Sequence, residues 1–169
     1  MAFTATFSSQ DGEPRDVYNI DFSVGAGVRG NQPDDIALVQ ALFRIVHFQL
    51  GPTRVPAPPG DSAIDVDGKL GPQTMRFIVN WQRQAKGLNV PVRLDGVFDP
   101  FRDQAGLSTV SKTRYALEIL NREANNRCRA EGIDNFAELP RDPDIPPFLA
   151  SALLDRRDVA RKYQGPGAL

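Results

Sequence analysis

The chain has 169 residues, of which 41% are hydrophobic, and its 20 lysines and arginines against 21 aspartates and glutamates leave a formal net charge of -1. That length and apolar content predict one domain, or a small domain with appended segments, and exclude wholesale disorder. The balanced charge provides no bulk attraction to nucleic acid or to an anionic membrane, so neither is expected as a partner.

Targeting and redox features are sparse. The N-terminal residues lack the basic, apolar and small-residue regions of a secretory signal, so we expect synthesis in the cytoplasm without a signal peptide. Delivery to the envelope, or incorporation into a particle, would then need another carrier. No run of about 18 apolar residues occurs, so membrane insertion is not expected. Cys128 is the only cysteine, which excludes an intrachain disulfide.

The N-terminal segment has the two-residue periodicity of β-strands. Apolar residues alternate with polar ones over residues 3–7 and again over residues 18–24, and this pattern indicates half-buried strands. Turn-forming residues at 11–14 separate the two runs, so we expect a β-hairpin followed by a glycine-rich loop. An isolated hairpin is marginally stable in water, so it must pack on the rest of the chain or on a partner.

A first helix is predicted to begin at residues 33–35, where an aspartate can cap the free N–H groups, and to end at residues 51–52. Its apolar residues recur at helical spacing. This leaves three polar residues that are predicted to point outward: Gln40, Arg44 and Gln49. Residues 51–62 are rich in proline, so we expect a loop there with little tendency to order alone.

The stretch VDGKLGPQT, residues 66–74, has three interpretations: a metal loop, a phosphate loop, or a turn that begins a helix. Asp67-Gly68 fits a tight turn in which glycine supplies a positive φ. Gly71-Pro72 then begins a helix over residues 73–86, since proline at the first position needs no N–H partner. The local physics therefore favours a turn followed by a helix.

The Asp-Gly turn followed by a proline occurs twice. Asp95-Gly96 repeats the Asp-Gly step and is again followed by a proline, Pro100. Gly87 is expected to end the second helix before this repeat. A turn-and-helix device that recurs within a short stretch predicts a small, internally repetitive helical domain.

The remaining elements are predicted from caps and breakers. Ser108 or Ser111 can cap a third helix over residues 109–130, which Gly132 ends. Residues 141–147 read as an extended linker, and residues 148–163 as an amphipathic helix. This last helix carries a basic end and an apolar side that could dock on a partner, although solvation and core packing are favoured for them. The basic residues are Arg156, Arg157, Arg161 and Lys162, and the apolar ones Phe148, Ala152, Leu153, Val159 and Tyr163.

The sequence gives little indication of a metal site or a catalytic motif. If Gly68 were the sixth residue of a calcium loop, Ala63 and Thr74 would stand where the first and last ligands belong. One histidine, His47, and one cysteine, Cys128, do not make a zinc set or an oriented nucleophile pair. The abundant acids leave a carboxylate pair for glycoside hydrolysis open. We expect no metal, no cofactor and no enzymatic activity.

The arrangement resembles the peptidoglycan-binding domain found beside many cell-wall hydrolases. That family has a Leu-Gln step on its first helix, the turn D-G-x-x-G-P-x-T, a second helix ending in F-Q, a G-L step and a second turn D-G-x-x-D-P. The resemblance covers about residues 23–121, with a longer loop at 51–62 and Arg102 where a Thr often begins the third helix. The matching residues are Val39-Gln40, Asp67-Gly68, Gly71-Pro72, Thr74, Trp81-Gln82, Gly87-Leu88, Asp95-Gly96 and Asp99-Pro100.

The resemblance implies a mainly α fold, with a three-helix peptidoglycan-binding-like bundle over residues 33–132. Residues 1–32 would add a β-hairpin with its glycine-rich lead-in, and residues 133–169 a proline-rich linker and an amphipathic helix. Most of the matching residues make turns and helix starts, so they indicate a fold and not a ligand site.

The resemblance also implies a function, which is non-catalytic binding of cell-wall peptidoglycan in a shallow groove near the second helix and the turns. The alternative is a structural or adaptor subunit of a phage-tail-like or contractile secretion particle. Such a subunit would dock on a protein partner through the N-terminal hairpin, which could add a strand to a sheet, and the C-terminal helix. Candidate ligand contacts are the polar residues Asp67, Lys69, Gln73, Arg76, Asn80 and Gln84.

Overall fold

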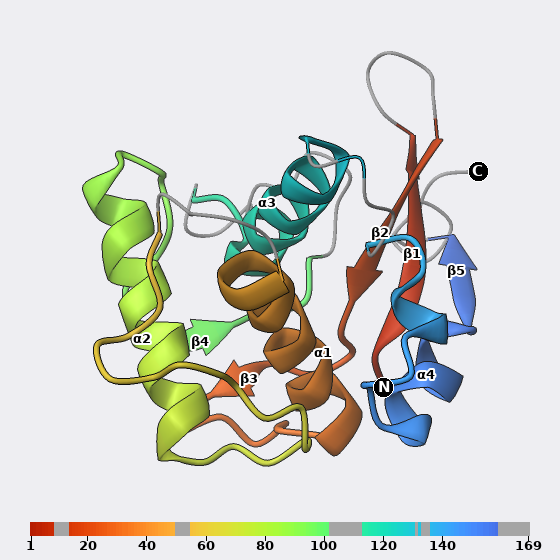
Figure 1. Ribbon diagram of the computed structural model, residues 1–169, viewed down its shortest axis with the longest axis horizontal. Helices are drawn as coiled ribbons and strands as arrows, with labels where there is room; N and C mark the ends of the chain where they lie inside the picture. Colours follow the sequence, from red (N-terminus) through yellow and green to blue (C-terminus); the bar gives the residue numbers. More distant parts are fainter. Residues whose placement is uncertain (9–13, 50–54, 102–112, 131, 133–135, 159–169) are drawn as a thin grey trace, which may run out of the picture.

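The chain is described by a computed structural model, which places residues 1–8, 14–49, 55–101, 113–130, 132 and 136–158. The fold is rich in helix and has a small mixed sheet. Figure 1 shows helix α1 in the middle, with α2 on one side and the strands β1, β2 and β5 on the other. Among the described residues, no helix has the length and apolar character needed to cross a membrane.

Two antiparallel strands open the chain. β1 (Phe3–Ser8) pairs with β2 (Pro14–Asn19), and Thr4 lies opposite Tyr18. The sequence predicts the second strand over residues 18–24, so its position is wrong by several residues. The chain leaves the sheet after Asn19 because the buried Asp35 carboxylate accepts the N–H of Phe22 at 3.1 Å and turns the backbone there. The expected turn at residues 11–13 lies outside the described residues.

The central helix α1 (Pro33–Arg44) continues into a π-helical turn, η1 (Ile45–Gln49). Its apolar residues are buried on all sides, since it packs between α2, α3 and the sheet. The prediction that Gln40 points outward is wrong, because its side chain is only 1% exposed. Arg44 is also engaged, with its guanidinium 2.7 Å from Asp142 Oδ2. A helix buried all round does not show an outward polar stripe.

Helix α2 (Pro72–Gly87) begins at a proline, as the sequence predicts. Its apolar face contributes Phe77, Ile78 and Trp81 to the core. Two of these rings contact rings of other elements. Phe77 lies with its ring centroid 5.7 Å from that of Phe43 on α1, and Trp81 lies 5.5 Å from Phe98 of β4 (Val97–Phe98). β4 pairs with β3 (Val24–Gly25) in a second, two-stranded sheet.

Helix α3 (Ala116–Ala130) begins later than predicted. The proposed caps Ser108 and Ser111 lie outside the described residues, and the chain just before α3 is not helical. The Arg114 N–H donates to the Pro91 carbonyl at 2.9 Å, which holds residue 114 against another segment and delays the helix. Leu117 and Leu120 are fully buried, as the helical spacing predicts.

The C-terminal region differs most from its prediction. Helix α4 (Pro147–Leu153) is short, and the following β5 (Arg156–Asp158) is a strand that pairs parallel to β1. The predicted helix over residues 148–163 is therefore wrong at residues 154–158, and its last residues, 159–163, lie outside the described residues. β1 would otherwise leave an unpaired edge, and its Thr4 N–H instead bonds the Asp155 carbonyl at 2.9 Å.

The predicted linker at residues 141–147 is fastened to the core. It follows a short 3-10 turn, η2 (Leu139–Arg141), and its Ile145 side chain is buried. Arg44 of α1 donates to the Asp144 carbonyl at 2.9 Å as well as pairing with Asp142. The two ends of the described chain thus pack together on the face of α1 away from α2.

Candidate functional site

Two buried glutamines hold the two Asp-Gly turns. Gln40 lies on α1 and reaches the first turn, while Gln82 lies on α2 and reaches the second. Both side chains are almost completely buried. Each amide oxygen accepts backbone N–H groups of its turn, and each amide nitrogen donates to the aspartate and to a backbone carbonyl. We call these arrangements the first and second glutamine clamps.

The first clamp is the larger. Gln40 Oε1 accepts the N–H groups of Asp67 at 3.1 Å and Gly68 at 2.9 Å. Its Nε2 lies 3.0 Å from Asp67 Oδ1 and 3.2 Å from the Lys69 carbonyl. The same Nε2 lies 2.9 Å from the hydroxyl of Thr74, the residue that the family pattern places after Gly71-Pro72. The clamp therefore joins α1, the turn and the first turn of α2.

The second clamp repeats this geometry with fewer contacts. Gln82 Oε1 accepts the Gly96 N–H at 2.9 Å, and its Nε2 donates to the Val97 carbonyl at 2.9 Å and to Asp95 Oδ1 at 3.4 Å. In both turns the aspartate carboxylate also accepts the N–H two residues ahead. Both glycines have φ of 71°, in the left-handed region that favours glycine.

Electrostatics stabilise the ionised aspartate of the first turn. Partial burial acts to raise the pKa of Asp67, but hydrogen bonds from the Lys69 N–H and the Gln40 amide outweigh it, and the pKa lies below its usual value. The carboxylate is thus an internal acceptor of this turn. Calcium finds no ligand set here, and no group of three or more metal-capable side chains gathers anywhere in the described part of the chain.

Four of the six candidate ligand contacts hold the loop that precedes α2. They lie on one face of α2 at helical spacing, and that face is covered by residues 56–65 of the proline-rich segment. Gln73 bonds the Ala63 carbonyl at 3.2 Å and Arg76 pairs with Asp61 at 2.7 Å. Asn80 and Gln84 both donate to the Pro56 carbonyl, at 2.9 and 3.0 Å.

The proline-rich loop is therefore ordered by α2 in its described part. Val55 and Ile64 of this loop are buried and anchor it in the core. Of the six candidates, Lys69 is exposed and its side chain has no hydrogen-bond or ion-pair partner among the described residues. The arrangement presents a composite surface of loop and helix and not a bare helix face.

The single histidine and the single cysteine lie on two elements in contact, η1 and α3. His47 stands on η1 among aromatic rings, with centroids 5.8 Å from Phe43 and 5.6 Å from Phe77. Burial lowers the pKa of His47 to about 4, so the imidazole is neutral at pH 7. Cys128 is buried on α3. Cys128 is part of the core, and His47 is partly buried beside it.

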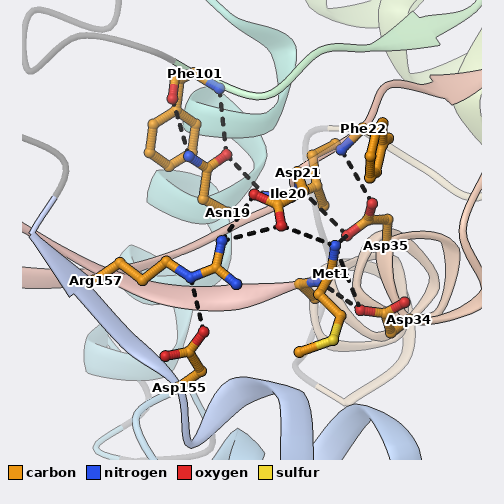
Figure 2. A network of polar contacts seen from close by, with 11 residues as sticks. Met1, Asn19, Ile20, Asp21, Phe22, Asp34, Asp35, Phe101, Asp155 and Arg157 are labelled. Carbon is orange, nitrogen blue, oxygen red and sulfur yellow. Dashed lines mark hydrogen bonds and ion pairs between the residues drawn. The ribbon is translucent and has the colours of Figure 1, made fainter. Parts of the chain in front are cut away.

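An acidic cluster surrounds the amino group of Met1 (Figure 2). This group lies 3.1 Å from Asp21 and 3.6 Å from the buried Asp35. Burial raises the pKa of Asp35 to about 6, although the nearby positive charge and two backbone N–H groups favour its ionised form. Arg157 of β5 reaches Asp21 at 2.8 Å from the other side, so the cluster joins β5 to the turn after β2.

The basic residues at the end of the chain have a different role from the predicted one. Arg157 and Arg156 lie on a strand and cannot complement a helix dipole there. Arg157 stacks over the Phe3 ring at 4.2 Å, and Arg156 pairs with Asp16 of β2. Arg161 and Lys162 lie outside the described residues, as do Val159 and Tyr163. Of the apolar side of the predicted helix, Ala152 and Leu153 are buried in the core.

Parts of the hairpin edges that could have accepted a partner strand are engaged by the chain itself. β5 pairs with β1, and Asn121 of α3 bonds both the N–H and the carbonyl of Tyr18 on β2, at 2.8 and 2.9 Å. Asn19 bonds the N–H and carbonyl of Phe101 in the same way. Sequence reasoning missed these asparagines and predicted Gln40 to point outward, whereas Gln82 is one of the residues that carry the family resemblance.

Comparison of the chain with protein-family models, with curated proteins and with solved structures finds no match. The resemblance to peptidoglycan-binding domains is therefore carried by the residues of the chain alone.

Proposed function

We propose that the chain is a non-catalytic binding module for cell-wall peptidoglycan, built on a three-helix peptidoglycan-binding-like bundle. The observation that carries this proposal is the pair of glutamine clamps. They give a common physical role to the Gln and Asp-Gly positions through which the sequence resembles that family. A repeated turn of this kind holds the helices in a fixed relation and leaves their outer surface for a ligand.

The proposed binding surface is the one formed by the first turn, the polar face of α2 and the loop that covers it. Lys69 stands exposed on the turn, and the side chain of Arg76 is 52% exposed although it pairs with Asp61. Asn80 and Gln84 sit beside them with the Pro56 carbonyl. Amide, carbonyl and cationic groups in one row suit the hydroxyls, amides and carboxylates of a glycan-peptide.

The packing of the hairpin and of α4 supports wall binding over the alternative of an adaptor subunit in a particle. The adaptor hypothesis relied on a hairpin edge and a terminal helix that were free to dock. Within the described residues, β1 is paired by β5, and α4 buries Leu149 and Leu153 in the core. Both docking devices are thus partly used inside the chain, although Phe148 of α4 and Leu154 just after it stay exposed.

The test is co-sedimentation of the purified chain with intact sacculi over a salt series. We expect saturable binding that survives moderate salt. Lys69→Ala should weaken it, while Lys86→Ala, which removes the same charge from the other end of α2, should not. An absence of saturable binding, or its loss at moderate salt, would contradict the proposal and return attention to a protein partner.

A second pair of variants separates ligand contact from loop fastening. Arg76→Gln and Asp61→Asn both break the ion pair that joins loop and helix. If Arg76 contacts the wall, only Arg76→Gln weakens co-sedimentation, because Asp61→Asn leaves the guanidinium free for the ligand. Equal losses in both variants would show that the pair acts only by holding the loop.

A further inference from the structure

One cavity lies far from the proposed wall-binding surface, between the sheet and the C-terminal end of α3. Its volume is about 530 Å³, within the range of about 300–1,000 Å³ that is usual for ligand sites. Thr4 and Tyr18 of the sheet line it, together with Arg129 of α3, Arg141 of η2 and Arg156 of β5. We call this cavity the arginine groove.

The groove has a positive charge that the chain as a whole lacks. Among its described lining residues are three arginines and one aspartate, Asp16, while the whole chain has a formal charge of -1. Arg129 is exposed and has no ion-pair partner among the described residues. Its place in the last turn of α3 complements the helix dipole, but that does not explain why Arg141 and Arg156, from two other elements, converge on the same cavity.

The ion pairs of the other two arginines can be exchanged for a ligand. Arg141 pairs with Glu138 at 2.9 Å and Arg156 pairs with Asp16, and all four side chains are largely exposed. Exposed pairs of this kind contribute little to stability, so an incoming carboxylate can replace the internal one at low cost. The planar guanidinium also matches a carboxylate in a bidentate geometry.

The lining is also apolar. Leu154 lines the groove and is 70% exposed, the most exposed of the large hydrophobic side chains described. Pro140 adds partly exposed apolar surface, and Phe136 and Leu153, although almost completely buried, also line the groove. A small inorganic anion would use the arginines but leave this surface in water.

We propose that the arginine groove binds a peptide segment of a protein partner in which an apolar side chain is flanked by acidic residues. The acids would meet Arg129, Arg141 and Arg156, and the apolar side chain would cover Leu154. The chain's own segment 159–169 is disfavoured as the occupant because its charged residues are Arg161 and Lys162, of the same sign as the groove. The proposal goes beyond wall binding and does not depend on it.

The experiment measures fluorescence anisotropy of a labelled, end-blocked hexapeptide, a leucine flanked by glutamates, against the full chain. We expect saturable binding that weakens as salt rises, and no binding of the same peptide with glutamines in place of glutamates. Arg129→Gln should weaken binding about fivefold or more through loss of a charge-assisted contact. Arg83→Gln, which removes an equal charge from the exposed face of α2, should leave it unchanged.

Leu154→Ser tests the apolar half of the proposal and should also weaken binding several-fold, with an unchanged melting temperature. Equal losses in the Arg129 and Arg83 variants would overturn the proposal, because they would indicate only general attraction to charge. Displacement of the peptide by inorganic phosphate at equal concentration would overturn it too, in favour of a simple anion site. Arg129→Gln should leave co-sedimentation with sacculi intact, so the failure of one proposal is distinguishable from the failure of the other.

Discussion

The two glutamine clamps are built from the same residue types, a glutamine and an Asp-Gly turn. The segments that follow the two turns nevertheless fold differently. After the first turn, Gly71-Pro72 begins a 16-residue helix at once. After the second, the chain pairs as a short strand, β4, and α3 begins only at Ala116. The clamp fixes where a turn lies, and the residues that follow it decide what the chain does next.

The reason for the difference lies in the partners of the following residues. Thr74 joins the first clamp and holds the start of α2 against Gln40. After the second turn, Asp99 accepts the Ser23 hydroxyl at 2.6 Å, and Asn19 holds both backbone groups of Phe101. These bonds keep residues 99–101 extended, so the Asp-Pro step at 99–100 does not begin a helix as a capping pattern would suggest.

The largest expected difference in stability between the two clamps comes from replacing their glutamines. Gln40→Leu should lower the free energy of unfolding by about 4 kcal/mol, because it leaves the buried Gly68 N–H and its neighbours without partners. Gln82→Leu removes fewer bonds and should cost about 2 kcal/mol. Urea unfolding of both variants measures the difference. Equal losses would show that the extra contacts of the first clamp contribute nothing.

Acid should act on the region of the first clamp and not on that of the second. α1 and η1 carry Asp35 and His47, whose pKa values are about 6 and about 4, while α2 carries no carboxylate and no histidine. His47 has a lowered pKa, so its contribution is present above pH 6.5 and is lost as pH falls toward 4. Asp35 has a raised pKa, so its ionisation costs stability as pH rises from 3.8 through 6.

These opposite effects nearly cancel in the natural chain, and each is worth about 3 kcal/mol from the size of its shift. His47→Phe should therefore gain stability relative to the natural chain, by up to about 3 kcal/mol, as pH falls from 6.5 to 4. Asp35→Asn should show the opposite trend over the same range. Unfolding curves at four pH values between 4 and 7 provide the test. A stability difference that is independent of pH would mean that the group titrates normally in the folded chain.

The glycines of the two turns, Gly68 and Gly96, should also differ in how much an added side chain destabilises the fold. Both have φ of 71°, so alanine is strained at either position by about 1 kcal/mol. A Cβ on Gly68 would also lie 2.6 Å from the Pro33 carbonyl oxygen, whereas one on Gly96 would meet only Met75, at 3.6 Å, and Val79, at 3.9 Å. Gly68→Ala should cost about 2–3 kcal/mol and Gly96→Ala about 1 kcal/mol. Thermal unfolding of the two variants would show the gap, and a larger loss at Gly96 would contradict it.

The sequence predicts turns and the starts of helices well, but it does not predict which residues distant in sequence contact one another. The Asp-Gly turns and the start of α2 at Pro72 follow from the conformational preferences of glycine and proline. The burial of Gln40 does not, because a lone glutamine in a helix reads as a surface residue until its turn is known. The strand β5 was missed for the same reason: residues 156–158 have the pattern of a helix, and only the free edge of β1 makes them a strand.

The candidate site shows the same limit. Gln73, Arg76, Asn80 and Gln84 lie at helical spacing on one face of α2. Their hydrogen bonds to the covering loop could not be predicted, because the loop has no periodicity that relates it to a helix face. The physical cause is the buried pair Val55 and Ile64, which draw the loop onto the core and bring its carbonyls to these side chains.

The smallest of the expected effects isolates the one residue that only the first clamp contains. Thr74→Val keeps the shape of the side chain and removes its hydroxyl, which lies 2.9 Å from Gln40 Nε2 and 3.2 Å from the Lys69 carbonyl. Because Gln40 keeps its bonds to the turn, the cost should be about 1 kcal/mol. In the Gln40→Leu background the same change should cost clearly less, since the hydroxyl has already lost one partner. Additive losses in a double-mutant cycle of unfolding free energies would mean that Thr74 stabilises the start of α2 by itself and is no part of the clamp.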